Sequence, residues 1–173
     1  MRSRRAFLRV GFMSVLILCG CSVITENVPE VQTAFSATVS VTMGENEVIC
    51  TVSRLPEGAA TICLTSPETV QGITYKWLNG DCSISYGELL CETDSIFLPD
   101  NSFVCCLEDI WTVCGDDTAL SYMGDEDNQA VFEGVCDSGE FTVYVDSQSG
   151  LIQKIVLPSL DMEAVFEDCK AIT

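Results

Sequence analysis

Hydrophobic and polar residues alternate with a period of two along most of the chain after residue 33. Such alternation predicts β-strands with one buried and one solvated face. Turn residues separate these stretches, and Asn79-Gly80 is a strong hairpin signal. The predicted strands span 34–43, 47–55, 60–65, 73–78, 82–86, 89–93, 130–136, 140–145, 151–157 and 162–168. The pattern therefore predicts a mainly β (α+β) fold with about 8–10 strands in an antiparallel sheet, and it does not support parallel βαβ units.

The segment between Ser102 and Gly115 departs from this alternation. Its apolar residues recur every three or four positions, which predicts an amphipathic α-helix of about three turns. These residues are Phe103, Cys106, Leu107, Ile110, Trp111 and Cys114. Because so short a helix is not stable alone in water, its apolar side must cover another element, and the open face of the sheet is the simplest choice.

Two interpretations of this helix fit the pattern. Its apolar side chains pack against the sheet as core, or they line a cavity that holds an apolar ligand or a lipid between sheet and helix. The candidate ligand-binding residues are Trp77, Phe103, Leu107, Ile110 and Trp111.

The first twenty-one residues have the features of an export signal. Four basic residues lie within the first nine positions, and an apolar run at 10–18 follows, which is too short for a stable transmembrane helix. The run ends in Leu18-Cys19-Gly20-Cys21, which resembles the bacterial lipobox. The resemblance implies a diacylglycerol on Cys21 and cleavage before it, although a plain signal peptide or an uncleaved anchor stays possible.

This interpretation divides the chain into three parts: a signal peptide at 1–20, a lipidated cysteine with a tether at 21–32, and a folded domain at 33–173. It predicts a palmitate-bearing lipoprotein of the cell membrane, anchored at the extracytoplasmic face. Positive charge at the start of the chain stays on the cytoplasmic side, so the acidic body is exported.

Charge excludes several classes of partner. From residue 21 onward the chain has 4 basic and 26 acidic residues, a net charge of −22. A body this acidic repels phosphate backbones and anionic headgroups, so we expect no nucleic-acid partner. Histidine is absent, which removes Ser-His and Cys-His nucleophile pairs and HExxH zinc sites.

We therefore predict that the protein is not an enzyme and has no catalytic residue, no cofactor and no metal. Carboxylate pairs for glycoside hydrolysis stay open in so acidic a chain, but no pair stands out. The acidic stretch 124–128 lacks the glycine and the glutamate of an EF-hand loop, so solvated loop charge is favoured over weak calcium binding.

Nine cysteines follow the lipobox, at positions 50, 63, 82, 91, 105, 106, 114, 136 and 169. An odd number prevents complete pairing within one chain, and no CxxC spacing occurs. Buried thiols that act as small hydrophobes are the favoured interpretation, and one or more disulfides or a metal or redox site are the alternatives.

The order of these elements resembles the lipoprotein-carrier superfamily (LolA/LolB and LppX-like). The matching features are the opening strand 35–42, the segment SPETVQGI at 66–73, the hairpin that contains Gly87, the helix, and the closing stretches FTVYVDSQSGLIQKIV at 141–156 and MEAVFED at 162–168. The resemblance implies a curved, unclosed antiparallel half-barrel with the helix over its concave face. Relatives bind acyl chains or other lipids in the hollow, or act as membrane-tethered partners of envelope and spore-coat enzymes. No ligand-contacting residue of the family maps onto a matching motif here.

Two hypotheses for function follow. The first is an anchored binding module that holds an apolar ligand or a lipid between sheet and helix. The second is a non-enzymatic envelope or sporulation-associated interaction protein, whose acidic surface docks a basic protein partner.

Overall fold

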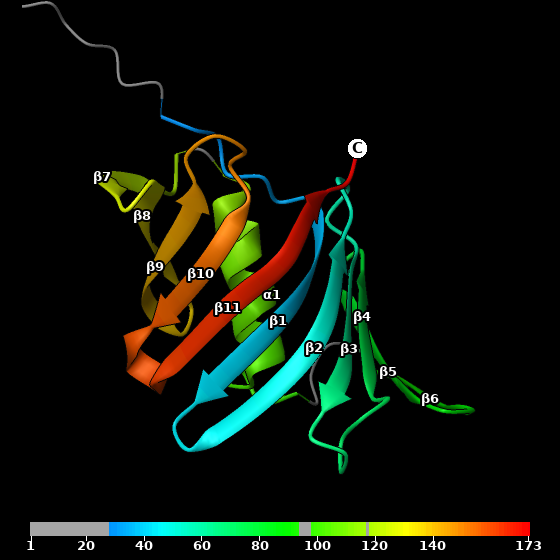
Figure 1. Cartoon of the computed structure of the whole chain (residues 1–173). Helices are drawn as coiled ribbons and strands as arrows, with labels where there is room; N and C mark the ends of the chain where they lie inside the picture. Colours follow the sequence, from blue (N-terminus) through cyan, green and yellow to red (C-terminus); the bar gives the residue numbers. More distant parts are fainter. Residues whose placement is uncertain (1–27, 94–97, 117) are drawn as a thin grey trace, which may run out of the picture.

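A computed structural model of the protein describes residues 28–93, 98–116 and 118–173, and the fold within them is one open β-sheet with an α-helix across one face (Figure 1). The strands are β1 (Phe35–Met43), β2 (Asn46–Arg54), β3 (Ala60–Ser66), β4 (Thr74–Leu78), β5 (Asp81–Tyr86), β6 (Leu89–Thr93), β7 (Ser121–Glu126), β8 (Gln129–Cys136), β9 (Gly139–Asp146), β10 (Ile152–Leu157) and β11 (Met162–Ala171). The helix α1 spans Phe103–Cys114, and a 3₁₀ turn spans Pro158–Leu160.

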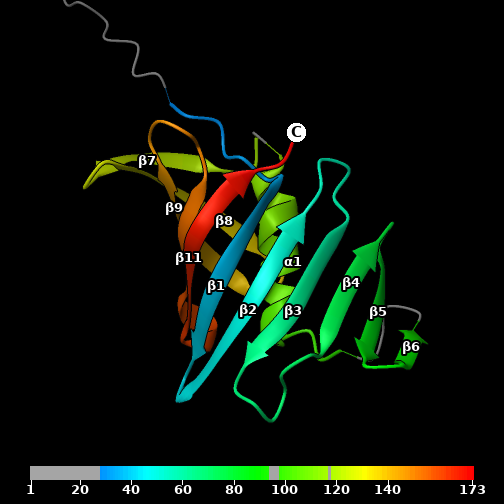
Figure 2. The same ribbon diagram turned by 45° about the vertical axis from the view of Figure 1, so that its right-hand side comes forward.

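The eleven strands form a single antiparallel sheet in the order β6-β5-β4-β3-β2-β1-β11-β10-β9-β8-β7. The first strand pairs with the last, from Phe35 opposite Ala171 to Met43 opposite Met162. All other neighbours are consecutive in the chain, so hairpins build the sheet outward from this central pair. The sheet is curved and does not close, which confirms the predicted half-barrel (Figures 1 and 2).

The ten predicted strands are all present, and β7 is an eleventh that the pattern did not predict. Its register against β8 shifts between Tyr122 and Gly124, and this irregularity breaks the alternation of apolar and polar residues. At the predicted Asn79-Gly80 turn both residues have positive φ, 54° and 89°, the conformation that a two-residue hairpin requires.

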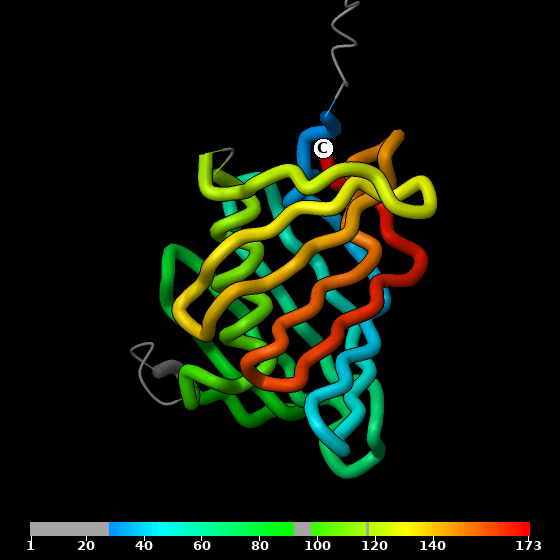
Figure 3. The backbone as a smooth tube through the Cα atoms, turned by 90° about the vertical axis from the view of Figure 1, so that its left-hand side faces the viewer, coloured from blue at the N-terminus to red at the C-terminus, as the bar shows by residue number. Residues whose placement is uncertain are grey.

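The predicted helix is confirmed, with Ser102 at its N-cap and Gly115 at its C-cap. Its buried side faces the concave face of the sheet, and Figure 3 shows it behind β8 and β9. Trp111 packs edge-on against Phe35 of β1, with ring centroids 5.6 Å apart, and Phe35 in turn meets Phe166 of β11 at 5.8 Å. The core therefore lies between α1 and the central strands.

The helix leaves one end of the sheet uncovered. The concave-face residues of β1, β2 and β3 are buried, as are those of β8 to β11. Strands β4 to β6 lie beyond α1 in Figure 2, and their side chains are mostly half-buried or exposed. Within the residues that the structure describes, no helix has the length and apolar character needed to cross a membrane.

Candidate ligand pocket

Three of the predicted ligand-binding residues fill the space between helix and sheet. Leu107, Ile110 and Trp111 are each 0% exposed and belong to the continuous core. Phe103 is half-buried at the start of α1 and also packs against this core. A ligand at the centre of this interface would have to displace close-packed side chains, which would cost about 2–5 kcal/mol per large residue.

Trp77 lies apart from the helical residues. It stacks on Tyr75 of the same strand, with ring centroids 6.2 Å apart, and lines a separate cavity described below. The sequence predicted one site that contains Trp77 and the helical residues. In the fold, the helical residues belong to the core, whereas Trp77 lines an open cavity. The other predicted site residue, Cys21, lies outside the described residues.

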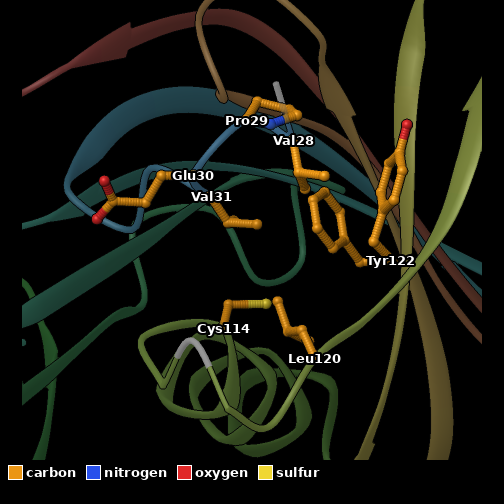
Figure 4. A pocket seen from close by; sticks show the side chains of 8 residues that line it. Val28, Pro29, Glu30, Val31, Cys114, Leu120 and Tyr122 are labelled. Carbon is orange, nitrogen blue, oxygen red and sulfur yellow. The ribbon is translucent and has the colours of Figure 1, made fainter. Parts of the chain in front are cut away.

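A pocket opens where α1 ends, and we call it the tether pocket because residues 28–31 form one wall. Its volume is about 410 Å³, within the range of small-molecule sites. Its lining comes from the N-terminal segment, the C-terminal end of α1, the following loop, and strands β7 and β8 (Figure 4). These residues are Val28, Pro29, Glu30, Val31, Cys114, Leu120, Tyr122 and Phe132.

Most of the side chains that line the tether pocket are apolar or aromatic and Glu30 is its single charged residue, while polar and apolar atoms share the pocket surface about equally. The rings of Tyr122 and Phe132 lie side by side, with centroids 5.4 Å apart. Burial raises the pKa of the Cys114 thiol to about 12, so this sulfur is a neutral, apolar part of the wall at physiological pH. The apolar side chains of this wall can contact a hydrocarbon chain.

Local hydrogen bonds hold the N-terminal wall in place. Asp146 Oδ1 accepts the backbone N–H groups of Gln148 and Ser149, at 3.2 and 2.8 Å, and so orders the loop after β9. The Gly150 carbonyl at the end of this loop accepts the N–H of Gln32 at 2.9 Å. Gly150 has a φ of +70°, and a Cβ there would collide with the backbone of Glu30. Glycine at 150 therefore allows the tether segment to lie against the sheet.

A second cavity, of about 600 Å³, lies beside the solvent-facing side of α1. Four carboxylates contribute to its wall: Asp100, Glu108, Asp109 and Asp137. We call it the acidic cavity, and Trp77 forms its apolar side. Glu108 and Asp109 lie on the side of α1 away from its apolar residues, at partly buried positions.

Burial shifts the pKa values of two of these carboxyl groups. Desolvation raises the pKa of Glu108 from 4.5 to about 7, although the nearby Arg54 opposes the shift. Desolvation also raises the pKa of Asp109, and the charges of Asp137 and Asp100 add to the effect. Arg54 is only 7% exposed; its Nη1 donates to the Thr33 carbonyl at 3.0 Å. The acidic cavity is thus a region of concentrated negative potential.

Cysteines that carry free thiols in the described part of the chain include Cys50, Cys63, Cys91, Cys105, Cys106, Cys114, Cys136 and Cys169. Burial raises the pKa of Cys50 to about 12 and also raises that of Cys106, so these thiols are protonated and unreactive. Among the residues that the structure describes, no group of three or more Cys, Asp or Glu side chains has the arrangement needed to hold a metal ion.

Comparison with known proteins identifies similar folds only. No family model and no curated protein matches the chain. An uncharacterized conserved protein from Thermus thermophilus is 12% identical, with a TM-score of 0.53 over 80% of this chain and 78% of its own. At this identity the likeness concerns the fold alone.

Two further solved structures match at lower similarity. A LolA superfamily protein from Nitrosomonas europaea is 9% identical, with a TM-score of 0.40 over 84% of this chain and 88% of its own. A chain from the complex of the CwlD amidase with the GerS lipoprotein of Clostridioides difficile is 12% identical, with a TM-score of 0.44 over 80% of this chain and 81% of its own.

Sequence reasoning missed the tether pocket because its lining comes from four separate stretches of the chain. Residues 28–31 belong to the predicted tether, which has no hydrophobic periodicity. Leu120 and Tyr122 lie in a segment for which the pattern predicts no strand. The one available signal was Cys114 at the end of the apolar side of α1, which marks where the helix leaves the sheet.

Proposed function

We propose that this protein is a lipid-anchored, extracytoplasmic binding protein that holds an apolar ligand, such as an acyl chain of a lipid, in the tether pocket. The observation that supports the proposal is a pocket of about 410 Å³ between the end of α1 and strands β7 and β8, with apolar side chains in its wall and the tether as one side. The proposed site is therefore the tether pocket and not the centre of the helix–sheet interface, which side chains fill. The proposed ligand class, an apolar ligand or a lipid, is the one that the sequence predicted.

The position of the tether supports access to a membrane. Val28 is seven residues from Cys21, so the pocket wall starts within about 25 Å of the proposed lipid attachment. The net charge of −22 keeps the body away from anionic headgroups, and two or more acyl chains on Cys21 would hold it at the surface. The pocket would then face a supply of acyl chains.

The size of the pocket limits the affinity. About eight buried methylene groups contribute about 6 kcal/mol at 0.8 kcal/mol each, before the loss of ligand freedom is counted. This corresponds to dissociation constants of tens of micromolar or weaker. A binding protein of this strength takes up and releases its ligand readily.

Titration of residues 22–173 with a dansyl-labelled fatty acid tests the pocket. We expect saturable binding, and we expect Leu120→Trp to weaken it about tenfold because the larger ring fills the pocket. Val135→Trp is the matched control, since Val135 is exposed on β8 and does not line the pocket. Absence of saturable binding, or equal binding by both variants, would contradict the proposal.

The anchor has its own test. Cys21→Ser removes the sulfur atom that receives the diacylglycerol in lipobox chemistry, so the variant should be released from the membrane or accumulate as a precursor. Partition into detergent distinguishes the variant from the unmodified protein, and mass spectrometry of the N-terminus detects the acyl groups. Membrane retention equal to that of the unmodified protein would count against the anchor.

A second candidate function, docking of a basic protein partner, is supported by the acidic cavity. Four carboxylates around about 600 Å³ favour Lys or Arg side chains, which form charge-assisted hydrogen bonds with them. Such docking should weaken steeply between low and physiological ionic strength, whereas fatty-acid binding should hardly change. A pull-down at low salt that recovers no basic partner would argue against this candidate.

A further inference from the structure

The two edges of the sheet differ in how they are protected from pairing with another chain. At the β7 edge, Asp125 and Glu126 lie in the strand, and its register against β8 shifts between Tyr122 and Gly124. Charges and irregular register are the features that natural proteins use to prevent strand addition. The β7 edge is therefore protected.

The β6 edge lacks these features over its first residues. Leu89 and Leu90 are 73% and 63% exposed, and Tyr86 on the adjoining strand is 57% exposed. The β5–β6 register runs without a shift from Tyr86 opposite Leu89 to Cys82 opposite Thr93. Within the described residues, no strand pairs with the outer side of β6. Residues Leu89–Cys91 form an apolar, regular and unpaired stretch of this edge, which Glu92 follows, and such a stretch is a template for another strand.

The turn before β6 fixes which backbone groups face outward. Gly87 and Glu88 form a two-residue loop, and the φ of +58° at Gly87 suits a hairpin turn of this length. In such a hairpin the hydrogen-bonded and non-bonded pairs alternate, beginning with a bonded pair at the turn. Leu90 belongs to the second pair, opposite Ser85, so its N–H and C=O face the free edge.

A hollow lies beside this edge and suits the side chains of an added strand. Its volume is about 390 Å³, and Thr69, Ile73, Ile84, Ser85, Tyr86, Leu89, Leu90 and Cys91 line it. The lining is mostly apolar and includes no charged residue. In strand addition, backbone hydrogen bonds supply affinity and such hollows select alternate side chains.

We propose that β6 is a docking edge for an extended segment of a partner protein in which apolar residues alternate with Lys or Arg. Strand addition satisfies the outward N–H and C=O of Leu90, and an apolar side chain of the segment enters the hollow. The basic residues face the exposed carboxylates Glu88 and Asp81 and the net charge of −22 that residues 21–173 carry. That charge disfavours a second copy of this chain as the occupant. The edge is separate from the tether pocket, and the inference does not rest on the proposed function.

The test uses the full chain in phosphatidylcholine nanodiscs and a fluorescein-labelled peptide, Lys-Val-Lys-Ile-Lys-Val-Lys. We expect saturable binding by fluorescence anisotropy. The same peptide with N-methyl groups on alternate residues cannot donate hydrogen bonds to β6, so its affinity should fall about tenfold or more. A peptide with Glu in place of Lys should not bind, because its charge repels the body.

Two variants of the protein localise the binding. Leu90→Lys places a charge on the β6 edge and should weaken binding about tenfold, while Met123→Lys makes the same charge change on the exposed surface of β7 and should leave binding unchanged. Circular dichroism checks that both variants fold. Both side chains are exposed, so neither change disturbs the core.

Four results would overturn the proposal. Equal binding by Leu90→Lys and Met123→Lys would locate the peptide elsewhere, and undiminished binding of the N-methylated peptide would exclude strand addition. A dimer in sedimentation that Leu90→Lys disperses would assign the edge to a second copy. Weaker association with lipid vesicles in Leu90→Lys, with unchanged peptide binding, would assign it to a membrane. None of these results affects the fatty-acid titration of the tether pocket.

Discussion

The carboxyl group of Glu108 links the acidic cavity to the stability of the fold. The side chain lies on α1, and one of its oxygens, Oε2, is buried without a hydrogen-bond partner. Desolvation raises its pKa from 4.5 to about 7. Between these two values the folded protein binds more protons than the unfolded chain, so the free energy of unfolding falls as the pH rises from 4.5 to above 7.

The magnitude follows from the difference between the two pKa values. At 1.36 kcal/mol per pH unit it corresponds to about 3 kcal/mol, and solvent screening at this partly exposed side chain reduces it to about 1–2 kcal/mol. Glu108→Gln keeps the shape of the side chain but removes its titration. The variant should therefore be about 1–2 kcal/mol more stable than the unmodified protein at pH 8 and about equal to it at pH 4.5.

Urea denaturation of residues 22–173 at several pH values between 4.5 and 8 measures this difference. Glu133→Gln is the matched control, because Glu133 is exposed on β8 and its replacement removes the same charge from the body. The control corrects for the general repulsion among the acidic residues. If the free energy of unfolding depends on pH in the same way in Glu108→Gln and in Glu133→Gln, burial of the Glu108 carboxylate is not the cause of this pH dependence.

Two other substitutions test the packing of the described core. Gly134→Ala should destabilise the protein by about 1–3 kcal/mol, because a Cβ there would lie 2.5 Å from the Phe141 ring. Urea denaturation measures this loss, and an unchanged midpoint would contradict the close contact between Gly134 and Phe141. Arg54→Met removes the buried donor to the Thr33 carbonyl and the cation that stabilises ionised Glu108. In Arg54→Met the pKa of Glu108 should rise further, so the free energy of unfolding should keep falling up to a higher pH than in the unmodified protein. A fall that ends at a lower pH would refute this role of Arg54.

The local pattern of the sequence predicted most of the secondary structure. Alternation with a period of two predicted ten strands, because an antiparallel strand with one face on a core needs an apolar residue at every second position. Spacing of three and four residues predicted α1, and Asn79-Gly80 predicted its hairpin. The missed strand, β7, contains the register shift at Gly124, where this periodicity fails.

Tertiary structure alone decided where open space lies. Leu107, Ile110 and Trp111 have the composition of a ligand site, but they are fully buried because α1 packs directly on the central strands. The tether pocket depends on Gly150, which lets the N-terminal segment approach the sheet, and no local pattern predicts that approach. The exposed edge at Leu90 follows from strand order, which the pairing of β1 with β11 determines across the length of the chain. Periodicity is a property of neighbouring residues, whereas cavities and free edges depend on which distant segments meet.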